Sequence, residues 1–359
     1  MRLTDVLNSL IPDNKAAGWD PVGIQIGDPA AEVGSIAVCH EVSEEVVDRI
    51  VEDPPDAVIA YHPLLFRPVT SLIAGSSPGG RALRMARTGV NLAVVHTAFD
   101  VAPGGTADAL AAAVGIVEGW GIGPLESSGG VKIVTFVPSA QVDEVAAAMA
   151  AAGAGSIGRY GGCSYRTEGV GTFVPSPEAN PVVGDRGSLH LEPETRLEMY
   201  APATREDAVA GALVAAHPYE EPAYDIYPTR SNEGFVGRVG PLAEPVSLAE
   251  LAQTVETNLP SGIVRTAGEP SSPVRTVAVV PGSGGGLISA AAVAGADVLI
   301  TGDVSHHQAV AALDRGIAVI DAGHAPTERP GMRSLYAAVA ALGVETRDLT
   351  SLKTNPWGR

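Results

Sequence analysis

Histidine and carboxylate side chains recur directly after short apolar runs of this chain. Four polar segments are placed in this way, residues 61–63, 96–100, 301–307 and 321–328. They contain five of the chain's eight histidines, namely His62, His96, His306, His307 and His324. Because parallel strands end at the same edge of a sheet, side chains from such segments can converge there. Imidazole and carboxylate ligands together suit zinc, iron, manganese or nickel, so we predict a site for one or two such divalent ions.

The elements that must position these side chains alternate between strands and helices. In the first third we expect strands at 35–39, 56–60 and 91–95, with helices beginning after Ser43 and covering about 80–88. The last third repeats this order, with strands at 274–280, 297–300 and 318–320 and helices at 286–294 and 308–315. The alternation predicts an α/β fold with a mixed, largely parallel sheet core flanked by helices.

The middle of the chain has a different texture. A strand is expected at 131–137 and a helix at 142–152, followed by a Gly/Pro/Ser-rich stretch at 153–187, a strand at about 196–200 and a helix at 205–215. This order resembles a small ferredoxin-like α+β module. We therefore predict an α/β metal-binding core, residues 1–125 plus 236–359, interrupted by an inserted α+β domain at 126–235.

Charge and composition exclude several classes of protein. The 23 basic and 41 acidic residues give a net charge of −18, which argues against binding nucleic acid or anionic membranes through a basic face. The 45% hydrophobic content supports a full core, and two cysteines are too few for a disulfide framework. The N-terminus lacks the pattern of a signal peptide. We expect a cytoplasmic protein that acts on a small molecule.

Several motifs together resemble one known family. They are WDPVGIQIG at 19–27, YHP at 61–63, HTAFD at 96–100 with Gly104-Gly105, TGD at 301–303 followed by His307, and GHAPTE at 323–328. The segment 216–225 is similar to the end of the domain inserted in longer members. In this order the motifs resemble the Nif-three-like dinuclear metal-binding family, whose members are often labelled GTP cyclohydrolase I type 2 homologs.

The resemblance implies a two-metal centre within a ring-shaped homohexamer. Its ligands, transferred position by position, are His62, Asp100, His324 and Glu328, with Glu328 bridging the two ions. One position departs from the family pattern, because Tyr61 stands where the family has the first histidine of H-H-P. A phenol, with a pKa near 10, is a poorer ligand for zinc than imidazole. We therefore expect one of the two metal positions to be weaker.

Other residues near these motifs admit more than one interpretation. His96 and His307 are candidates for catalytic acid–base groups, for extra ligands, or for structural residues at strand ends. Trp19 and Asp20 either line the site or anchor the N-terminal helix. The glycines at 282–286 follow a strand, but they lack the G-x-G-x-x-G spacing, so a sharp turn explains them better than a dinucleotide site. The segment 217–221 is expected to be a structural turn.

The leading functional hypothesis is a metal-dependent hydrolase that acts on a nucleotide-like or other small heterocyclic substrate. The alternative is a non-catalytic hexameric assembly that binds or handles metal, or senses a ligand through its inserted domain. A dinucleotide-binding oxidoreductase is a third hypothesis, which rests on the glycine turn alone.

Overall fold

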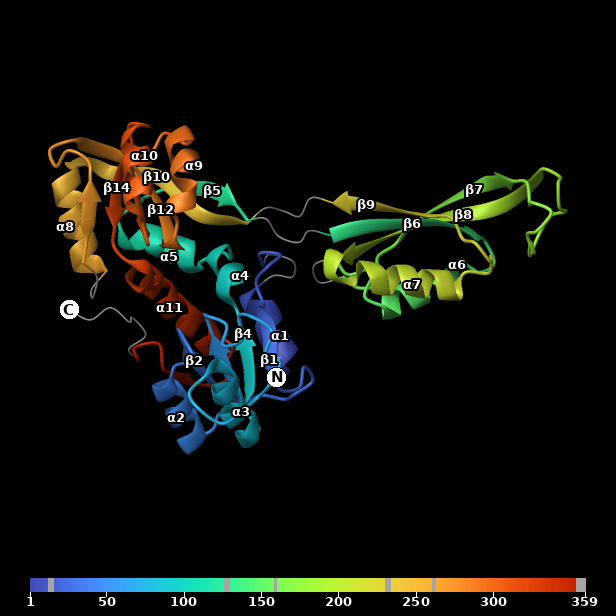
Figure 1. Ribbon diagram of the computed structural model, residues 1–359, viewed down its shortest axis with the longest axis horizontal. Coiled ribbons are helices and arrows are strands. Elements are labelled where there is room, and N and C mark those ends of the chain that lie inside the picture. Colours follow the sequence, from blue (N-terminus) through green and yellow to red (C-terminus); the bar gives the residue numbers. More distant parts are fainter. Residues whose placement is uncertain (12–15, 126–129, 158–159, 230–233, 260–262, 353–359) are drawn as a thin grey trace. The chain divides into compact units, whose positions relative to one another are not determined.

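The computed structural model describes residues 1–11, 16–125, 130–157, 160–229, 234–259 and 263–352. The chain divides into two compact units (Figure 1). One comprises Met1–Leu125 and Glu233–Arg359, and we call it the core unit. The other comprises Glu126–Asn232, and we call it the middle unit. No helix among the described residues is long and apolar enough to cross a membrane.

The first sheet of the core unit has the strand order β1-β4-β3-β2-β15. Its strands are β1 (Gly23–Ile26), β2 (Ser35–Cys39), β3 (Ala57–Ala60), β4 (Asn91–Val94) and β15 (Glu345–Asp348). Only β1, at one edge, pairs antiparallel, and the other four strands are parallel. The carboxyl ends of β2, β3 and β4 therefore lie side by side.

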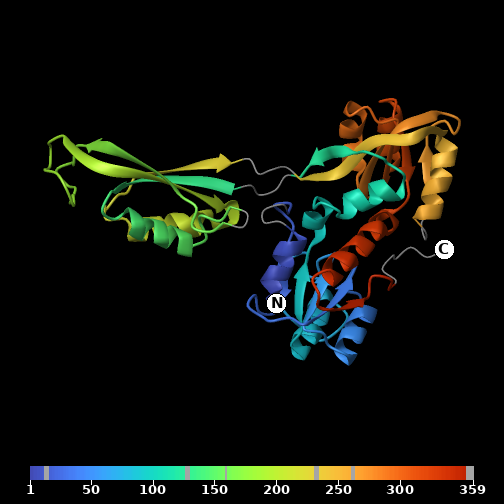
Figure 2. The same ribbon diagram turned by 180° about the vertical axis from the view of Figure 1, so that it is seen from behind.

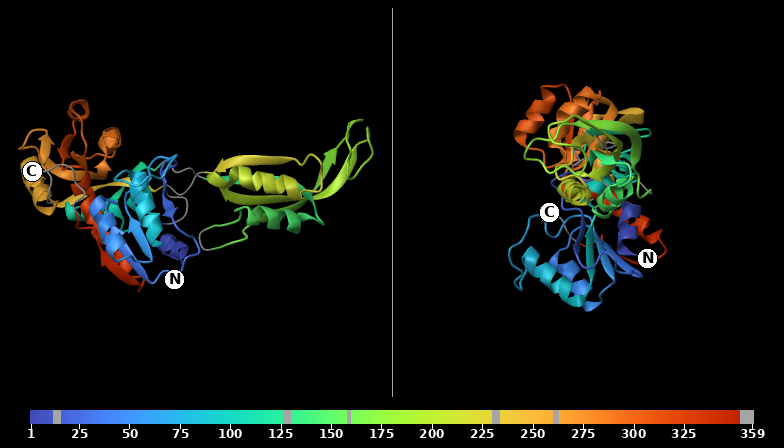
Figure 3. Two further views of the ribbon diagram at one scale, coloured as in Figure 1. Left: turned by 60° about the horizontal axis from the view of Figure 1, so that its bottom comes forward. Right: turned by 90° about the vertical axis from the view of Figure 1, so that its right-hand side faces the viewer.

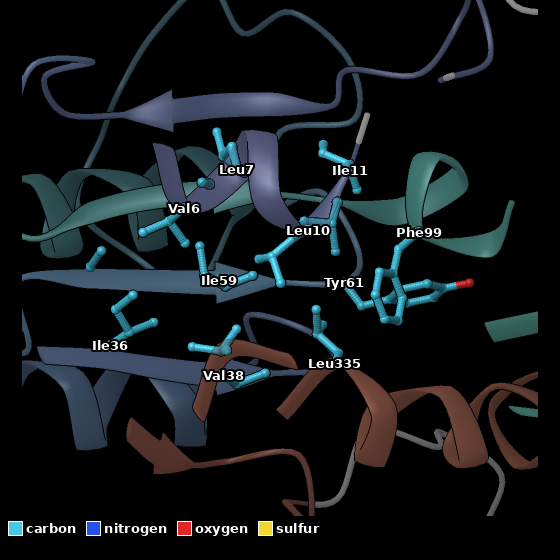
Figure 4. Close-up of a cluster of buried hydrophobic side chains, with 14 of the residues drawn as sticks. Val6, Leu7, Leu10, Ile11, Ile36, Val38, Ile59, Tyr61, Phe99 and Leu335 are labelled. Atoms are coloured by element: carbon cyan, nitrogen blue, oxygen red, sulfur yellow. The ribbon is translucent and has the colours of Figure 1, made fainter. Parts of the chain in front are cut away.

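Helices cover both faces of this sheet. Side chains of α1 (Leu3–Leu10) and α11 (His324–Ala340) pack on one face, and those of α2 (Glu44–Glu52) and α3 (Pro78–Thr88) pack on the other. The ribbons of these helices flank the sheet in Figure 3. The predicted start of α2 after Ser43 is confirmed. The Ser43 side chain caps the helix by accepting a hydrogen bond from the backbone N–H of Val46. Figure 4 shows the apolar side chains buried between this sheet and helices α1 and α11. Tyr61 lies at the end of this group, with its hydroxyl oxygen directed away from the aliphatic side chains.

The second sheet of the core unit has the order β11-β14-β13-β12-β10-β5. Its strands are β5 (Trp120–Pro124), β10 (Phe235–Ser247), β11 (Arg265–Ala267), β12 (Pro273–Ser283), β13 (Val298–Gly302) and β14 (Ala318–Asp321). Strands β12, β13 and β14 are parallel. Side chains of α5 (Thr106–Ala113) and α8 (Leu248–Asn258) pack on one face, and those of α9 (Ile288–Val293) and α10 (His306–Leu313) on the other. The predicted α/β class with a mixed, largely parallel sheet core is thereby confirmed.

Two further helices bring the sheets' polar ends together. The short helix α4 (His96–Asp100) begins almost directly after β4. Helix α11 begins three residues after β14 and contacts strands of both sheets, among them β2, β12 and β13. Side chains at the start of α11 can therefore meet those that follow β2 and β3.

The middle unit is an antiparallel sheet with the order β7-β8-β6-β9. Its elements are β6 (Gly130–Pro138), α6 (Val142–Ala151), β7 (Tyr165–Phe173), β8 (His190–Pro202), α7 (Glu206–Ala216) and β9 (Tyr224–Thr229). Helices α6 and α7 lie side by side and pack on one face of the sheet (Figure 2). The Gly/Pro/Ser-rich stretch at 153–187 is not all loop, because it contains the nine-residue strand β7. Two glycines within β7 hid this strand in the sequence.

Candidate metal centre

Three imidazole rings surround one buried carboxylate in the core unit. Glu328, in the second turn of α11, is 2% exposed. His40 Nε2 lies 2.9 Å from its Oε2, and His324 Nε2 lies 3.0 Å from its Oε1. His62 Nε2 lies 3.5 Å from Oε1. Since His40 follows β2 and His62 follows β3, the parallel sheet and α11 together create this cluster.

The donor atoms of this cluster fit a metal ion. One ligand atom from each of His40, His62 and Glu328 can be chosen so that all three lie within 4.8 Å of one another. Nitrogen and carboxylate donors of this kind suit zinc and similar divalent ions. The space beside them depends on Gly282, whose φ is +64°. A Cβ atom there would lie 2.8 Å from Glu328 Oε1 and 3.3 Å from His324 Nε2. A larger residue would therefore fill the place that this glycine leaves open.

The titratable groups of the cluster shift one another's pKa values. Burial raises the pKa of Glu328, but hydrogen bonds from His324, His40 and His62 outweigh burial and hold it well below the usual value. The hydrogen bond to Glu328 raises the pKa of His324 to about 9 against the effect of burial. The pKa of His40 is lowered, because burial disfavours its charged form. The cluster thus presents an ionised carboxylate to imidazoles that compete for its two oxygens.

A second carboxylate orients His324. Asp303 Oδ2 lies 2.6 Å from His324 Nδ1, so this nitrogen donates and Nε2 faces Glu328. Carboxylates commonly fix metal-binding histidines in this manner. Among the described residues Asp303 is the only non-glycine residue with a positive φ, +55°. This backbone conformation is costly for a side chain other than glycine and is often found at functional sites.

Tyr61 is a hydrogen-bond donor next to the cluster. Its hydroxyl donates to Asp100 Oδ1 at 2.6 Å, and its ring stacks on that of His40 with centroids 5.6 Å apart. Burial, followed by the charge of Asp100, raises the pKa of Tyr61 well above the usual value. Burial also raises the pKa of Asp100 to about 6. Tyr61 is therefore a neutral phenol that occupies one oxygen of Asp100.

His96 lies beside Tyr61 and His62 and is held by the carboxylate of Asp20. Its Nδ1 lies 2.9 Å from both carboxylate oxygens of Asp20, which also accepts hydrogen bonds from the backbone and hydroxyl of Thr97. Burial lowers the pKa of His96, but the hydrogen bond to Asp20 outweighs burial and raises it. Trp19 is 65% exposed, so it is not a buried anchor. Its ring meets the edges of His96 and Phe66, with centroids 6.3 and 6.0 Å away.

The four ligands expected from the sequence come from three places in the fold. His62, His324 and Glu328 are joined by the contacts described above. Asp100, at the end of α4, reaches the cluster through Tyr61. The arrangement is compatible with all four assignments, which remain predictions.

The two expected acid–base histidines differ in position. The ring of His96 lies 5.2 Å from that of His62, centroid to centroid. His307 is exposed in the first turn of α10, with its ring 5.4 Å from that of His306. Within the described ranges its side chain forms no hydrogen bond or ion pair. His96 is therefore the better placed of the two for proton transfer near the cluster.

His40 is the site residue that the sequence interpretation missed. It directly follows β2, as His96 follows the end of β4 within two residues. The signal was present, but none of the family motifs quoted above contains His40. The parallel register places its backbone beside that of His62, whose N–H donates to the His40 carbonyl at 2.9 Å.

The glycine-rich segment 282–286 forms a turn between β12 and α9. The backbone N–H of Gly282 donates to Thr327 Oγ1 at 2.9 Å, and that of Gly284 donates to Thr301 Oγ1 at 2.8 Å. Two backbone groups that a phosphate would need are thus engaged within the protein. This favours the turn interpretation over a dinucleotide site.

The fold and this cluster define a class of α/β proteins that gather imidazoles and carboxylates where parallel strands end. Residues 1–356 match the family model described as Duf34/NIF3 (NGG1p interacting factor 3). The chain belongs to this family, and the resemblance of its motifs is thereby confirmed.

Relatives and solved structures of the family cover nearly all of the chain. A Bacillus subtilis protein named GTP cyclohydrolase 1 type 2 homolog is 37% identical over 90% of this chain and 87% of its own length. A Mycobacterium leprae protein of the same name is 36% identical over 99% of this chain and 95% of its own. The crystal structure of a Bacillus cereus protein related to NIF3 superimposes with a TM-score of 0.64 at 34% identity, covering 99% of this chain and 97% of that one.

Proposed function

We propose that this protein is a metal-dependent hydrolase with a dinuclear centre, acting on a nucleotide-like or other small heterocyclic substrate. The observation that carries the proposal is the convergence of three imidazole Nε2 atoms on the buried carboxylate of Glu328. A divalent ion held there would act as a Lewis acid and lower the pKa of a bound water molecule. The names of the relatives support a role in nucleotide chemistry.

Glu328 is proposed to serve two metal positions at once. One of its oxygens faces His40, and the other faces His62 and His324. We assign His40, His62 and Glu328 to the first position, because their donor atoms are already grouped. Asp100, His324 and Glu328 are proposed for the second position. It is the weaker one, because Tyr61 occupies an oxygen of Asp100.

His96 is proposed to move protons during the reaction. Its Nδ1 is engaged by Asp20, so Nε2 is the nitrogen that can exchange a proton with a substrate. Asp20 also stabilises the charged form of the ring, as the raised pKa of His96 indicates. His307, which is exposed in the first turn of α10, is proposed as a second acid–base candidate.

A planar heterocycle suits the aromatic surface next to His96. Trp19 and Phe66 are 65% and 49% exposed, and their rings meet edge to face. Exposed aromatic rings of this kind can stack on a flat base. We also propose that the protein is cytoplasmic and, from the family resemblance, that it assembles as a homohexamer. Native mass spectrometry tests the hexamer directly.

Activity and metal content, measured together, test the proposal. Protein without a histidine tag is stripped with a chelator, reloaded with zinc, manganese, iron(II) or nickel, and screened against nucleotides, phosphoesters and pterin precursors. We expect hydrolysis that requires metal and falls at least about a hundredfold in His96→Gln, while metal content is retained. His306→Gln is the matched control, because His306 is an exposed histidine of α10. Full metal loading without turnover of any compound would favour the non-catalytic assembly.

A further inference from the structure

A cavity lies on the face of the middle-unit sheet that the helices leave uncovered. Its volume is about 610 Å³, a size typical of small-molecule sites. The residues of β6 and β8 that pack against α6 and α7 include Ile133 and Leu197, whereas the alternate residues Phe136, Glu194 and Arg196 line the cavity. Residues of segment 175–183 also line it. All of the lining residues belong to the middle unit.

The charge of this cavity is negative. Four carboxylates line it, those of Glu168, Glu194, Glu220 and Glu221, against the single guanidinium of Arg196. Arg196 forms an ion pair with Glu198, which is not part of the lining. An anionic ligand would therefore meet uncompensated repulsion, whereas a cation would be attracted.

Glu194 supplies a buried acceptor with free capacity. The residue is 8% exposed, and its Oε1 accepts a hydrogen bond from the Tyr219 hydroxyl at 2.9 Å. In the part of the chain that the structure describes, no donor contacts its Oε2. This oxygen lies over Gly171, where a Cβ atom would be 1.9 Å away. This oxygen is therefore available to accept a hydrogen bond from a donor group of a ligand.

Aromatic rings stand beside this carboxylate. The rings of Phe173 and Tyr219 have centroids 6.1 Å apart, and both residues line the cavity with Phe136. Aromatic faces next to a carboxylate attract organic cations through cation–π interactions. Val170, Pro175 and Val182 add apolar wall that suits a hydrocarbon body.

We propose that this cavity binds a small organic cation, in which an ammonium group contacts Glu194 and an apolar body lies against Phe136 and Phe173. The inference does not depend on the proposed hydrolase function, because every residue involved lies in the middle unit. Nothing covalent occurs at this site.

Calorimetric titration of the full-length protein with 2-phenylethylammonium tests the proposal. The neutral 2-phenylethanol and the anionic 3-phenylpropanoate serve as probes of similar shape. We expect saturable binding of the ammonium, binding of the alcohol weaker by about tenfold or more, and no detectable binding of the carboxylate. Equal affinity for the ammonium and the alcohol, or no saturable binding of the ammonium, would overturn the proposal.

Two variants locate the binding. Glu194→Gln keeps an acceptor for Tyr219 but removes the charge, so we expect it to lose about tenfold in affinity for the ammonium. Glu206→Gln, on α7 at the other face of the sheet, removes the same charge and should bind like the unaltered protein. An unchanged affinity in Glu194→Gln would contradict the proposal. If circular dichroism shows that this variant is misfolded, the three probes on the unaltered protein decide.

Discussion

The hydroxyl of Tyr61 donates a 2.6 Å hydrogen bond to Asp100. Both residues are buried, and they follow the neighbouring parallel strands β3 and β4. Tyr61 has a phenol where the family has an imidazole, and the family resemblance implies that Asp100 is a metal ligand. The structure shows what this departure does locally, because a neutral phenol occupies one oxygen of Asp100, the residue proposed as a ligand. At the same time His40, which the sequence interpretation overlooked, places an imidazole against Glu328.

Replacing Tyr61 should change how much metal the protein binds. Tyr61→His adds an imidazole and removes the phenol from Asp100, so we expect metal stoichiometry to rise toward two per chain or the weaker site to tighten. Tyr61→Phe is the comparison variant, because it frees the same oxygen of Asp100 without adding an imidazole, so it should tighten the weaker site less than Tyr61→His does. Its lost buried hydrogen bond should also lower the free energy of unfolding by about 1–3 kcal/mol, which denaturant titration measures. Calorimetric titration with metal compares both variants with the unaltered protein. Two equally tight sites in the unaltered protein, unchanged in Tyr61→His, would refute this account of Tyr61.

Gly282→Ala should reduce metal binding. Its Cβ atom would lie 2.8 Å from Glu328 Oε1, and the residue's φ of +64° would add about 1–2 kcal/mol of backbone strain. Gly286→Ala is the matched control in the same turn, because a Cβ atom there has nothing within 4 Å. Elemental analysis of both purified variants makes the comparison. Similar metal content in the two would show that the space beside Glu328 is not needed.

Removing the middle unit should leave a folded core. Strands β5 and β10 pair antiparallel, with Pro124 opposite Phe235, and the backbone N–H of Leu125 donates to the carbonyl of Gly234. The chain therefore leaves and re-enters the core at adjacent points. Joining Leu125 to Phe235 through a short Gly/Ser linker should give a soluble protein that binds metal, as circular dichroism and elemental analysis would show. An insoluble or metal-free product would count against the predicted boundaries at 126–235.

The turn at His217 should loosen in acid. His217 Nε2 donates to the carbonyl of Phe136, and Nδ1 accepts from the backbone N–H of Tyr219, so the buried ring must be neutral. Burial lowers its pKa from the ordinary 6.5. The unfolded state therefore takes up a proton first as pH falls. The contribution of His217 to stability should be constant above pH 6.5 and decrease below it, by at most about 1.4 kcal/mol per pH unit.

Hydrogen exchange measures this effect locally. The protection factor of the Tyr219 amide, corrected for the intrinsic rate at each pH, should fall between pH 7.5 and about 5. His190→Gln, which alters a half-buried histidine paired with Glu192, should leave the fall unchanged. A protection factor that stays constant over this range would contradict the prediction.

Alternating apolar runs made the α/β class and the strands of the core predictable. Strand β2 has the predicted bounds, Ser35–Cys39, because its apolar run is short and Ser43 caps the next helix. Helix α11, which carries Glu328, was not predicted. Its sequence contains Pro330, which normally argues against a helix interior. Tertiary packing between the two sheets overrides that local preference.

The site was predictable only in part for a similar reason. The histidines after β3 and β4 were found because they follow apolar strands within recognisable motifs. The contribution of Asp303 and Asp20 depends on contacts across 21 and 76 residues, which spacing in the sequence does not reveal. The same holds for His40, which meets Glu328 across 288 residues.

The metal content of Glu328→Ala tests the central claim most directly. Both oxygens of Glu328 face imidazole nitrogens, so its loss should empty the site more completely than His62→Ala does. Glu345→Ala, at an exposed position on β15, is the control and should keep the metal of the unaltered protein. Inductively coupled plasma mass spectrometry of protein purified without a histidine tag gives the answer. We predict near-complete loss of divalent metal in Glu328→Ala, whereas wild-type metal content in that variant would contradict the assigned centre.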